Sequence, residues 1–307
     1  MKLKEVYQDA LKRNYSLGAF NFYNMESMKG ILNAAEELNT PVILAVSESA
    51  IKYFGEEYLK NAITAAKSTY TVPFFIHLDH GKNLEICKTA INLGFDSIMI
   101  DGSSFPLDQN IQLTKMVVDY AKKFNIQVEG ELGVLSGTED DVTSNHHLFT
   151  SPVEAKLFVE QTGVDSLAIA IGTSHGINKF SGEAKIRTDI LTQIETELKD
   201  FPLVLHGASS INQQTISQIN SLGGNIKNAK GVPEDILQEV STKHNICKIN
   251  VDSDIRLATT LALREYLTQN PDQIDPRKYL SYATNAITNL VKHKIQNIFK
   301  TKPYKKL

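Results

Sequence analysis

The stretch Phe74–Gly81 reads FFIHLDHG, an apolar run that passes directly into two histidines and an aspartate. The apolar residues are typical of a buried β-strand. Burying a polar group without a partner costs about 2–7 kcal/mol, so core packing does not account for the polar residues. Polar residues at the carboxyl end of an apolar strand are typical of an active site in a parallel α/β protein. The alternative is an ordinary hydrogen-bonded pair of Asp79 and His80. This alternative is less favoured because two more histidines, His175 and His206, also lie at or after the ends of apolar strands.

Short apolar runs and longer segments of helical periodicity alternate along the whole chain. The predicted strands are Leu17–Phe22, Val42–Ser47, Phe74–Asp79, Ser97–Asp101, Ile126–Glu131, Ser166–Ile171, Leu203–His206 and Ile246–Val251. The predicted helices are Met25–Leu38, Glu57–Tyr70, Asn83–Leu93, Leu107–Phe124, Pro152–Gln161, Asp189–Leu198 and Gln213–Leu222. Apolar strands separated by helices indicate a parallel sheet covered on both faces. Eight such repeats predict an α/β fold that is a single (β/α)8 TIM barrel. An open doubly wound sheet is the alternative, but it lacks the glycine-rich turn after the first strand.

Composition limits the classes of protein that the chain can belong to. A length of 307 residues suits one barrel domain over residues 1–307. The net charge of −3 and the pI near 6.3 give no basic surface for nucleic acid. Two cysteines in apolar surroundings, Cys87 and Cys247, predict a reducing compartment. The charged N-terminus and the lack of an apolar run of about 20 residues predict a soluble cytoplasmic protein without a membrane partner.

Four segments stand outside the simple repeat. Loops Leu132–Leu148 and Gly172–Thr188, after the fifth and sixth strands, are long for a barrel and are predicted to be lids. An extra helix is predicted to begin at Gly231–Asp235. Residues 277–300 are predicted to form an amphipathic C-terminal helix that needs a partner surface, either the barrel or a second subunit.

Unusual polar residues follow most of the later strands of the predicted barrel. They are Asp79, His80, Asp101, Glu131, His175, His206, Asn250, Asp252 and Asp254. All of them belong to the carboxyl-end rim, where barrel active sites form. Three imidazoles from three strands suit a catalytic zinc ion, which takes three protein ligands and keeps a fourth position open.

Glycine-rich turns accompany two of these histidines, in Gly172–Gly176 (GTSHG) and His206–Ser210 (HGASS). Glycine beside a ligand lets backbone N–H groups approach an anion closely. Barrels often bind phosphate at the loops after strands seven and eight, near a helix N-terminus. With Ser209, Asn250 and Ser253 as further donors, these turns predict a phosphorylated substrate.

Seven motifs together resemble the class II, metal-dependent fructose-1,6-bisphosphate aldolase family over nearly the whole chain. They are GAFN (18–21), HLDHG (77–81), MID (99–101), VEGELG (128–133), GTSHG (172–176), LHGAS (205–209) and NVDSDIR (250–256). The resemblance implies a glycolytic and gluconeogenic lyase. Such an enzyme reversibly cleaves fructose 1,6-bisphosphate to dihydroxyacetone phosphate and glyceraldehyde 3-phosphate. It also implies a homodimer or homotetramer.

The catalytic roles follow from the same resemblance. It implies that His80, His175 and His206 bind the catalytic zinc, a Lewis acid for the ketone oxygen that stabilises the enediolate left by carbon–carbon cleavage. It implies that Asp79 takes the proton of the C4 hydroxyl in cleavage and returns it in condensation. Glu139, in the first long loop, matches the carboxylate that protonates the enediolate carbon.

Two more acidic residues, Asp101 and Glu131, match positions that hold an alternative or second zinc position. Many relatives have a histidine two residues after the glycine that follows Asp101, where this chain reads Ser103-Ser104, so the hydrogen bonding around the fourth strand is open.

The substrate-binding residues that the resemblance implies fall into three groups. Gly176, Gly207, Ser209, Asn250 and Ser253 form the ketose-phosphate cradle, helped by a monovalent cation (Na+ or K+) at the glycine carbonyls. Asn21, Ser47 and Lys179 lie at the edge of the site. Asp252 and Arg256 resemble the branch that prefers fructose bisphosphate over tagatose 1,6-bisphosphate, its C4 epimer.

Other functions remain open from the residues alone. Tagatose-1,6-bisphosphate cleavage is the nearest alternative. A metal-dependent TIM-barrel hydrolase also uses rim histidines, but it does not need phosphate turns beside them. A class I aldolase needs a desolvated lysine inside the barrel, for which Lys248 is the candidate, with its side-chain direction open. A binding protein that kept only the fold is expected to have lost Asp79 or a metal ligand.

Overall fold

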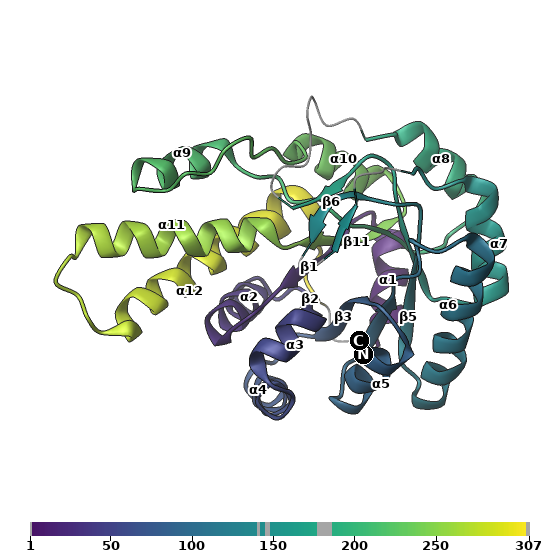
Figure 1. Ribbon diagram of the computed structural model, residues 1–307, viewed down its shortest axis with the longest axis horizontal. Helices are drawn as coiled ribbons and strands as arrows, with labels where there is room; N and C mark the ends of the chain where they lie inside the picture. Colours follow the sequence, from purple (N-terminus) through teal and green to yellow (C-terminus); the bar gives the residue numbers. More distant parts are fainter. Residues whose placement is uncertain (1, 140–141, 145–147, 177–185, 305–307) are drawn as a thin grey trace.

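The computed structural model describes residues 2–139, 142–144, 148–176 and 186–304. Eight of the strands in these ranges close into a parallel barrel in the order β1-β11-β10-β8-β5-β4-β3-β2 (Figure 1). This confirms the predicted (β/α)8 fold. The barrel strands are β1 (Leu17–Asn21), β2 (Val42–Ser47), β3 (Phe74–Gly81), β4 (Ser97–Ile100), β5 (Gln127–Leu132), β8 (Ser166–Ile169), β10 (Leu203–Leu205) and β11 (Ile246–Val251).

Helices cover the outside of the barrel, and every helix predicted between strands is present. They are α2 (Met25–Leu38), α4 (Glu56–Thr69), α5 (Leu84–Asn92), α6 (Leu107–Ala121), α7 (Pro152–Thr162), α8 (Thr188–Glu197) and α9 (Gln213–Ser221). The predicted extra helix is α10 (Glu234–Lys243). Several begin at an asparagine or serine whose side chain accepts from the first-turn backbone, such as Asn24 for α2 and Ser151 for α7. Three helices lie outside the predicted set: α1 (Leu3–Arg13), α3 (Glu48–Phe54) and α11 (Ser253–Gln269).

The first helix, α1, closes the amino-terminal end of the barrel. Its apolar residues Leu3, Val6 and Tyr7 belong to one buried cluster with Leu17 of β1 and Phe75 of β3. This cluster fills the end of the barrel opposite to the predicted active-site rim. The interior is therefore apolar at one end and polar at the other.

The two long loops meet in a small sheet. The loop after β5 contains the antiparallel pair β6 (Ser136–Glu139) and β7 (Val142–Ser144). Strand β6 also pairs in parallel with β9 (Ser174–His175), which lies in the loop after β8. The described parts of the two predicted lids are thus hydrogen-bonded to each other above the barrel.

Helix α11 and helix α12 (Pro276–His293) project from one side of the barrel as a long hairpin (Figure 1). Ala283, Ile287 and Val291 of α12 are buried, Ile287 and Val291 belong to the main apolar core, and α12 packs against α2 as well as α11. The barrel wall is therefore one partner surface of the predicted amphipathic helix. The chain continues into the π-helical segment η2 (Lys294–Phe299), which contacts α10 and β1. None of the helices in the described part of the chain is both long and apolar enough to cross a membrane.

We expect the substitution Gly30→Ala to destabilise the protein at the contact between α2 and α12. A Cβ atom at Gly30 would lie 2.8 Å from Cβ of Ile287 and 3.0 Å from the carbonyl oxygen of Thr284. Alanine gains about 1 kcal/mol of helix propensity, but overpacking against rigid atoms costs about 1–3 kcal/mol. The melting temperature should fall, whereas Lys29→Ala on the exposed face of α2 should leave it unchanged. If Gly30→Ala melted at the same temperature as the parent, α2 and α12 would be able to move apart at this contact without loss of stability.

Candidate active site

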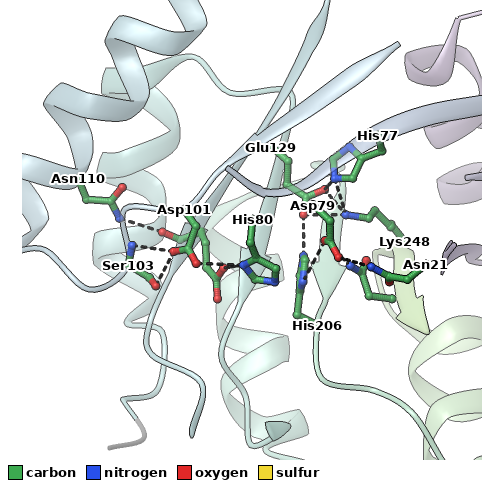
Figure 2. Close-up of polar contacts among 12 residues, drawn as sticks. Asn21, His77, Asp79, His80, Asp101, Ser103, Asn110, Glu129, His206 and Lys248 are labelled. Atoms are coloured by element: carbon green, nitrogen blue, oxygen red, sulfur yellow. Dashed lines mark hydrogen bonds and ion pairs between the residues drawn. The ribbon is translucent and has the colours of Figure 1, made fainter. Parts of the chain in front are cut away.

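The carboxylate of Asp79 is held from both sides at the mouth of the barrel. Its Oδ2 accepts a hydrogen bond of 2.8 Å from Nδ2 of Asn21 on β1 (Figure 2). Its Oδ1 accepts one of 2.8 Å from Nδ2 of Asn250 on β11. Asp79 is only 1% exposed. The two amides fix its orientation and leave its charge to interact with whatever enters the mouth.

His80 points toward the same mouth because the backbone of β3 is irregular there. Its φ angle is +50°, and the register with β4 shifts between Leu78 and Gly81. A bulge of this kind re-aims a side chain that a regular strand would turn outward. Two consecutive residues, Asp79 and His80, therefore both reach the site. Positive φ is uncommon for a residue with a side chain and is frequent at functional sites.

Two carboxylates lie beside Nδ1 of His80. Oδ2 of Asp101 is 3.0 Å away and Oε2 of Glu131 is 3.6 Å away. Ser103 donates to Oδ1 of Asp101 through both its backbone N–H, at 3.0 Å, and its hydroxyl, at 2.7 Å. Burial opposes ionisation of Asp101, but the hydrogen bonds from His80 and Ser103 outweigh it and hold the pKa of that carboxyl well below its usual value. Ser103 thus supplies hydrogen bonding that the sequence had left open around the fourth strand.

The rings of His206, which directly follows β10, and of His80 lie in a T-shaped arrangement. The two ring centroids are 4.6 Å apart at an interplanar angle of 71°. Nδ1 of His206 lies 4.0 Å from Oδ1 of Asp79, and Nε2 lies 2.8 Å from Oε1 of Glu129. An imidazole that donates Nε2–H to a carboxylate keeps its lone pair at Nδ1. Burial, followed by the charge of Lys248, lowers the pKa of His206, which favours the neutral ring that metals bind.

A buried ion pair lies directly beneath these residues, inside the barrel. Nζ of Lys248 is 2.9 and 2.8 Å from the two carboxylate oxygens of Glu129 and 3.0 Å from Nε2 of His77 (Figure 2). His77 in turn hydrogen-bonds through Nδ1 to the hydroxyl of Ser97 at 2.8 Å. Burial, followed by the charge of Lys248, lowers the pKa of His77 to about 3, so the ring is neutral and accepts from the ammonium.

The charge on Glu129 is supported by the same neighbours. Burial opposes ionisation, but Lys248 and His206 outweigh it and lower the pKa of the carboxyl. The side chain of Lys248 points into the barrel, which answers the question that its sequence position left open. Its partners make it a structural cation, because a Schiff-base lysine has to lose its proton and reach the substrate.

His77 and Glu129 were not among the predicted site residues, and Lys248 was named only as the class I candidate, although strand alternation points to all three. Side chains two residues apart on a strand point to the same face. The inward pairs are His77 and Asp79 on β3, Glu129 and Glu131 on β5, and Lys248 and Asn250 on β11. Each pair places one polar residue at the rim and one a layer deeper.

The described residues contain two groups whose donor atoms fit a metal ion. In Asp79, His80 and His206, the potential ligand atoms lie within 4.8 Å of one another. The same holds for His80, Asp101 and Glu131. Two imidazoles with a carboxylate form a donor set that zinc accepts, and His80 belongs to both groups. The residues present therefore fit a metal at this place.

The loop after β10 is packed tightly against the loop that carries β9. Gly207 has a φ of +62°, and a Cβ atom there would lie 2.6 Å from the carbonyl oxygen of Ser174. Only glycine allows this approach of the two backbones. Ser209 follows in the same loop and Ser253 begins α11, and both are buried. Ser47 ends β2 opposite Asp79, where its hydroxyl caps α3.

Asp252 and Arg256 pair with each other at the start of α11. Nε of Arg256 lies 3.0 and 2.9 Å from the two oxygens of Asp252, and the guanidinium stacks over the ring of Tyr23 at 4.6 Å. The Tyr23 hydroxyl donates to Oδ1 of Asp252 at 2.6 Å. Tyr23 was not among the predicted site residues. Three other predicted site groups lie outside the described residues: Lys179 and the side chains of His175 and Glu139. Gly176 lies just after β9, with a φ of +78°.

Comparison with known proteins agrees with this geometry. A family model described as "Fructose-bisphosphate aldolase class-II" matches residues 1–302. A fructose-bisphosphate aldolase of Treponema pallidum is 42% identical, with 96% of this chain and 94% of that protein covered. A fructose-bisphosphate aldolase of Giardia intestinalis is 46% identical, with 96% and 91% covered.

Solved structures give the same result. The YdjI aldolase from Escherichia coli K12 superposes with a TM-score of 0.80 at 28% identity, covering 98% of this chain and 97% of that one. A putative fructose-1,6-bisphosphate aldolase from Coccidioides immitis superposes with a TM-score of 0.79 at 26% identity, covering 97% and 96%.

We expect Lys248→Met to lower the free energy of unfolding by about 3–5 kcal/mol, because it leaves the buried carboxylate of Glu129 without its cation. The double variant Lys248→Met/Glu129→Gln should recover part of this loss. Urea denaturation in the presence of a chelator measures the free energies of unfolding of both variants without a contribution from bound metal. Lys243→Met, at an exposed pair with Glu239, is the control and should change stability by at most about 1 kcal/mol. If Lys248→Met were as mild as that control, the ion pair would not support the site.

Proposed function

The chain belongs to the class-II fructose-bisphosphate aldolase family, and on that premise we propose how its residues carry out the reaction. It is a lyase that reversibly cleaves fructose 1,6-bisphosphate to dihydroxyacetone phosphate and glyceraldehyde 3-phosphate. The observation that carries the assignment to these residues is the cluster of Asp79, His80 and His206, whose ligand atoms lie within 4.8 Å of one another at the mouth of the barrel.

The metal in this proposal is zinc, held by His80 and His206 together with His175 from the loop after β8. A zinc ion bound there supplies a Lewis acid that polarises the ketone and stabilises the negative charge left by carbon–carbon cleavage. His80 and His206 each hydrogen-bond to a carboxylate through one ring nitrogen, Asp101 for the first and Glu129 for the second. Such partners fix the ring orientation and raise the basicity of the other nitrogen.

Asp101 and Glu131 are proposed as an alternative or second metal position. Both lie beside Nδ1 of His80 and form the second group of potential ligands with it. A metal in that position has to compete with the hydrogen bond between His80 and Asp101.

The acid and base of the proposed reaction are carboxylates. Asp79 takes the proton of the C4 hydroxyl during cleavage and returns it during condensation. The amides of Asn21 and Asn250 hold both of its oxygens and keep it oriented for this transfer. Glu139, from the β6 strand above the barrel, is proposed to protonate the carbon of the three-carbon ketose phosphate at which the carbon–carbon bond was broken.

The ketose phosphate is proposed to bind between the loop after β9, the loop after β10 and the start of α11. The residues of this phosphate cradle are Gly176, Gly207, Ser209, Asn250 and Ser253, with a monovalent cation (Na+ or K+) at the glycine carbonyls. The tight approach of Gly207 to the Ser174 carbonyl supports this arrangement, because it brings oxygen and N–H groups of two loops together. Asn21, Ser47 and Lys179 are proposed at the edge of the site.

Fructose bisphosphate is proposed as the preferred sugar over its C4 epimer, tagatose 1,6-bisphosphate. The inversion moves the hydroxyl that Asp79 has to reach, so the far end of the sugar has to be held differently. Asp252 and Arg256 are the proposed determinants. Together with Tyr23 they form a hydrogen-bonded group at the start of α11.

The wider setting follows the family. We propose that residues 1–307 act as one domain, that the chain forms a homodimer or homotetramer, and that it works in glycolysis in the cytoplasm. No nucleic acid or membrane partner is part of this proposal.

Removing the metal should abolish aldol cleavage, because the charge left on the ketose fragment loses its stabilisation. Elemental analysis should find one zinc per chain, and dialysis against a chelator should remove it together with the activity. Added zinc or cobalt should restore cleavage. His206→Asn should bind less zinc, whereas His244→Asn should bind as much as the parent, because His244 pairs with Glu195 away from the site. Full activity in metal-free protein would contradict the proposal.

The two bisphosphates should differ clearly in kcat/KM, with fructose 1,6-bisphosphate favoured. Asp252→Ala and Arg256→Lys should each bring the two kcat/KM values closer together. The first removes the partner of Arg256, and in the second a lysine cannot reproduce the planar pairing and stacking of an arginine. Measuring both sugars on the purified protein and on the two variants provides the test. Equal or reversed values for the parent protein would assign the chain to tagatose bisphosphate instead.

A further inference from the structure

A lysine from the C-terminal segment lies buried beneath the loop after β10. Lys294, the first residue of η2, is only 1% exposed. Its Nζ lies 2.8 Å from Oδ2 of Asp254, 2.6 Å from the hydroxyl of Ser210 and 3.5 Å from Oε1 of Glu234. The yellow end of α12 returns here from the tip of the hairpin (Figure 1). Burying an ammonium group costs free energy unless the group is paired. Lys294 therefore differs from the solvent-exposed lysines on the surface of the protein.

Asp254, its partner, holds the backbone of that loop. Its two oxygens accept from the N–H of Ser210 at 3.0 Å and from the N–H of Ile211 at 2.9 Å. Asp254 is the second residue of α11 and is 5% exposed. One carboxylate therefore ties the loop after β10 to the helix after β11.

The loop that Asp254 holds is strained. Ile211 has a φ of +49°, a conformation that is a genuine outlier for a β-branched residue. Such a backbone persists only where its surroundings over-determine it. Here the N–H of Ile211 is fixed by Asp254, and Asp254 is fixed by Lys294. The hydroxyl of Ser210 adds a second link, because it contacts both Lys294 and Oε1 of Glu234, the latter at 3.1 Å.

The residues tied together are neighbours of the proposed phosphate cradle. Ser209 lies immediately before Ser210 in the loop, and Ser253 lies immediately before Asp254 in α11. The spacing between these two serines depends on the carboxylate that bridges their neighbours. Binding constellations have to be held within about 0.5 Å of their productive geometry, so this bridge controls a distance that matters.

We propose that Lys294 is a positioning residue for phosphate binding: through Asp254 it fixes the loop after β10 against the start of α11. The inference rests on the proposed function, because it needs a phosphorylated substrate in that cradle. It gives the C-terminal segment a role in substrate binding, although Lys294 itself does not touch the substrate.

The test is Lys294→Met, which keeps the length of the side chain and removes its charge. KM for fructose 1,6-bisphosphate and the inhibition constant of inorganic phosphate should both rise by about tenfold, the effect of losing one charge-assisted hydrogen bond. The value of kcat and the zinc content should stay close to those of the parent, because neither Asp79 nor the metal ligands are touched. Lys292→Met, at an exposed pair with Glu37, is the matched control and should change none of these values.

A second variant covers the case in which Lys294→Met does not fold. Ser210→Ala removes only the hydroxyl that joins the loop to Lys294 and Glu234, and it leaves the ion pair intact. It should raise KM and the phosphate inhibition constant by about two- to fivefold, in the same direction and with the same unchanged kcat. Unchanged phosphate affinity in the folded variants would overturn the inference while leaving cleavage by the parent intact. A parent protein that does not cleave the bisphosphate would instead overturn the proposed function.

Discussion

Inside the barrel, the ammonium of Lys248 bridges the carboxylate of Glu129 and the neutral ring of His77. These groups come from β11, β5 and β3, so the contact fixes three strands relative to one another. Glu129 is also the acceptor for His206, whose orientation the rim depends on. Uncompensated, any one of these buried charges destabilises the fold by several kcal/mol, and together they form a rigid base for the residues above.

The rim itself combines regular and irregular backbone. Asp79 points inward because it continues the alternation of β3, and its position follows from the pleat alone. His80 reaches the same mouth only because the strand breaks its register and adopts a positive φ. Within β3, only His80 has a positive φ, and its hydrogen bond to Asp101 supports that conformation. The two adjacent polar residues can therefore act on the same substrate from one strand.

The C-terminal part of the chain connects the periphery to the centre. Helix α12 packs against α2 on the outside of the barrel, and η2 then brings Lys294 under the loop after β10. A surface helix and an interior cation thus belong to one continuous segment. The strained loop at Ile211 is the point where this segment meets the proposed phosphate cradle.

The barrel could be predicted from the sequence, because eight apolar runs separated by helical periodicity leave few other ways to bury the strands. The sequence also predicted Asp79, His80 and His206 at one rim, since the carboxyl ends of parallel strands share an edge. It did not predict α1, α3 and α11, whose positions depend on surfaces that exist only once the barrel has closed. The pairing of Lys248 with Glu129 and that of Lys294 with Asp254 are visible only in the folded chain. Lys248 and Glu129 are 119 residues apart in the chain, and Lys294 and Asp254 are about forty apart. No local sequence pattern encodes which buried charges pair over such separations.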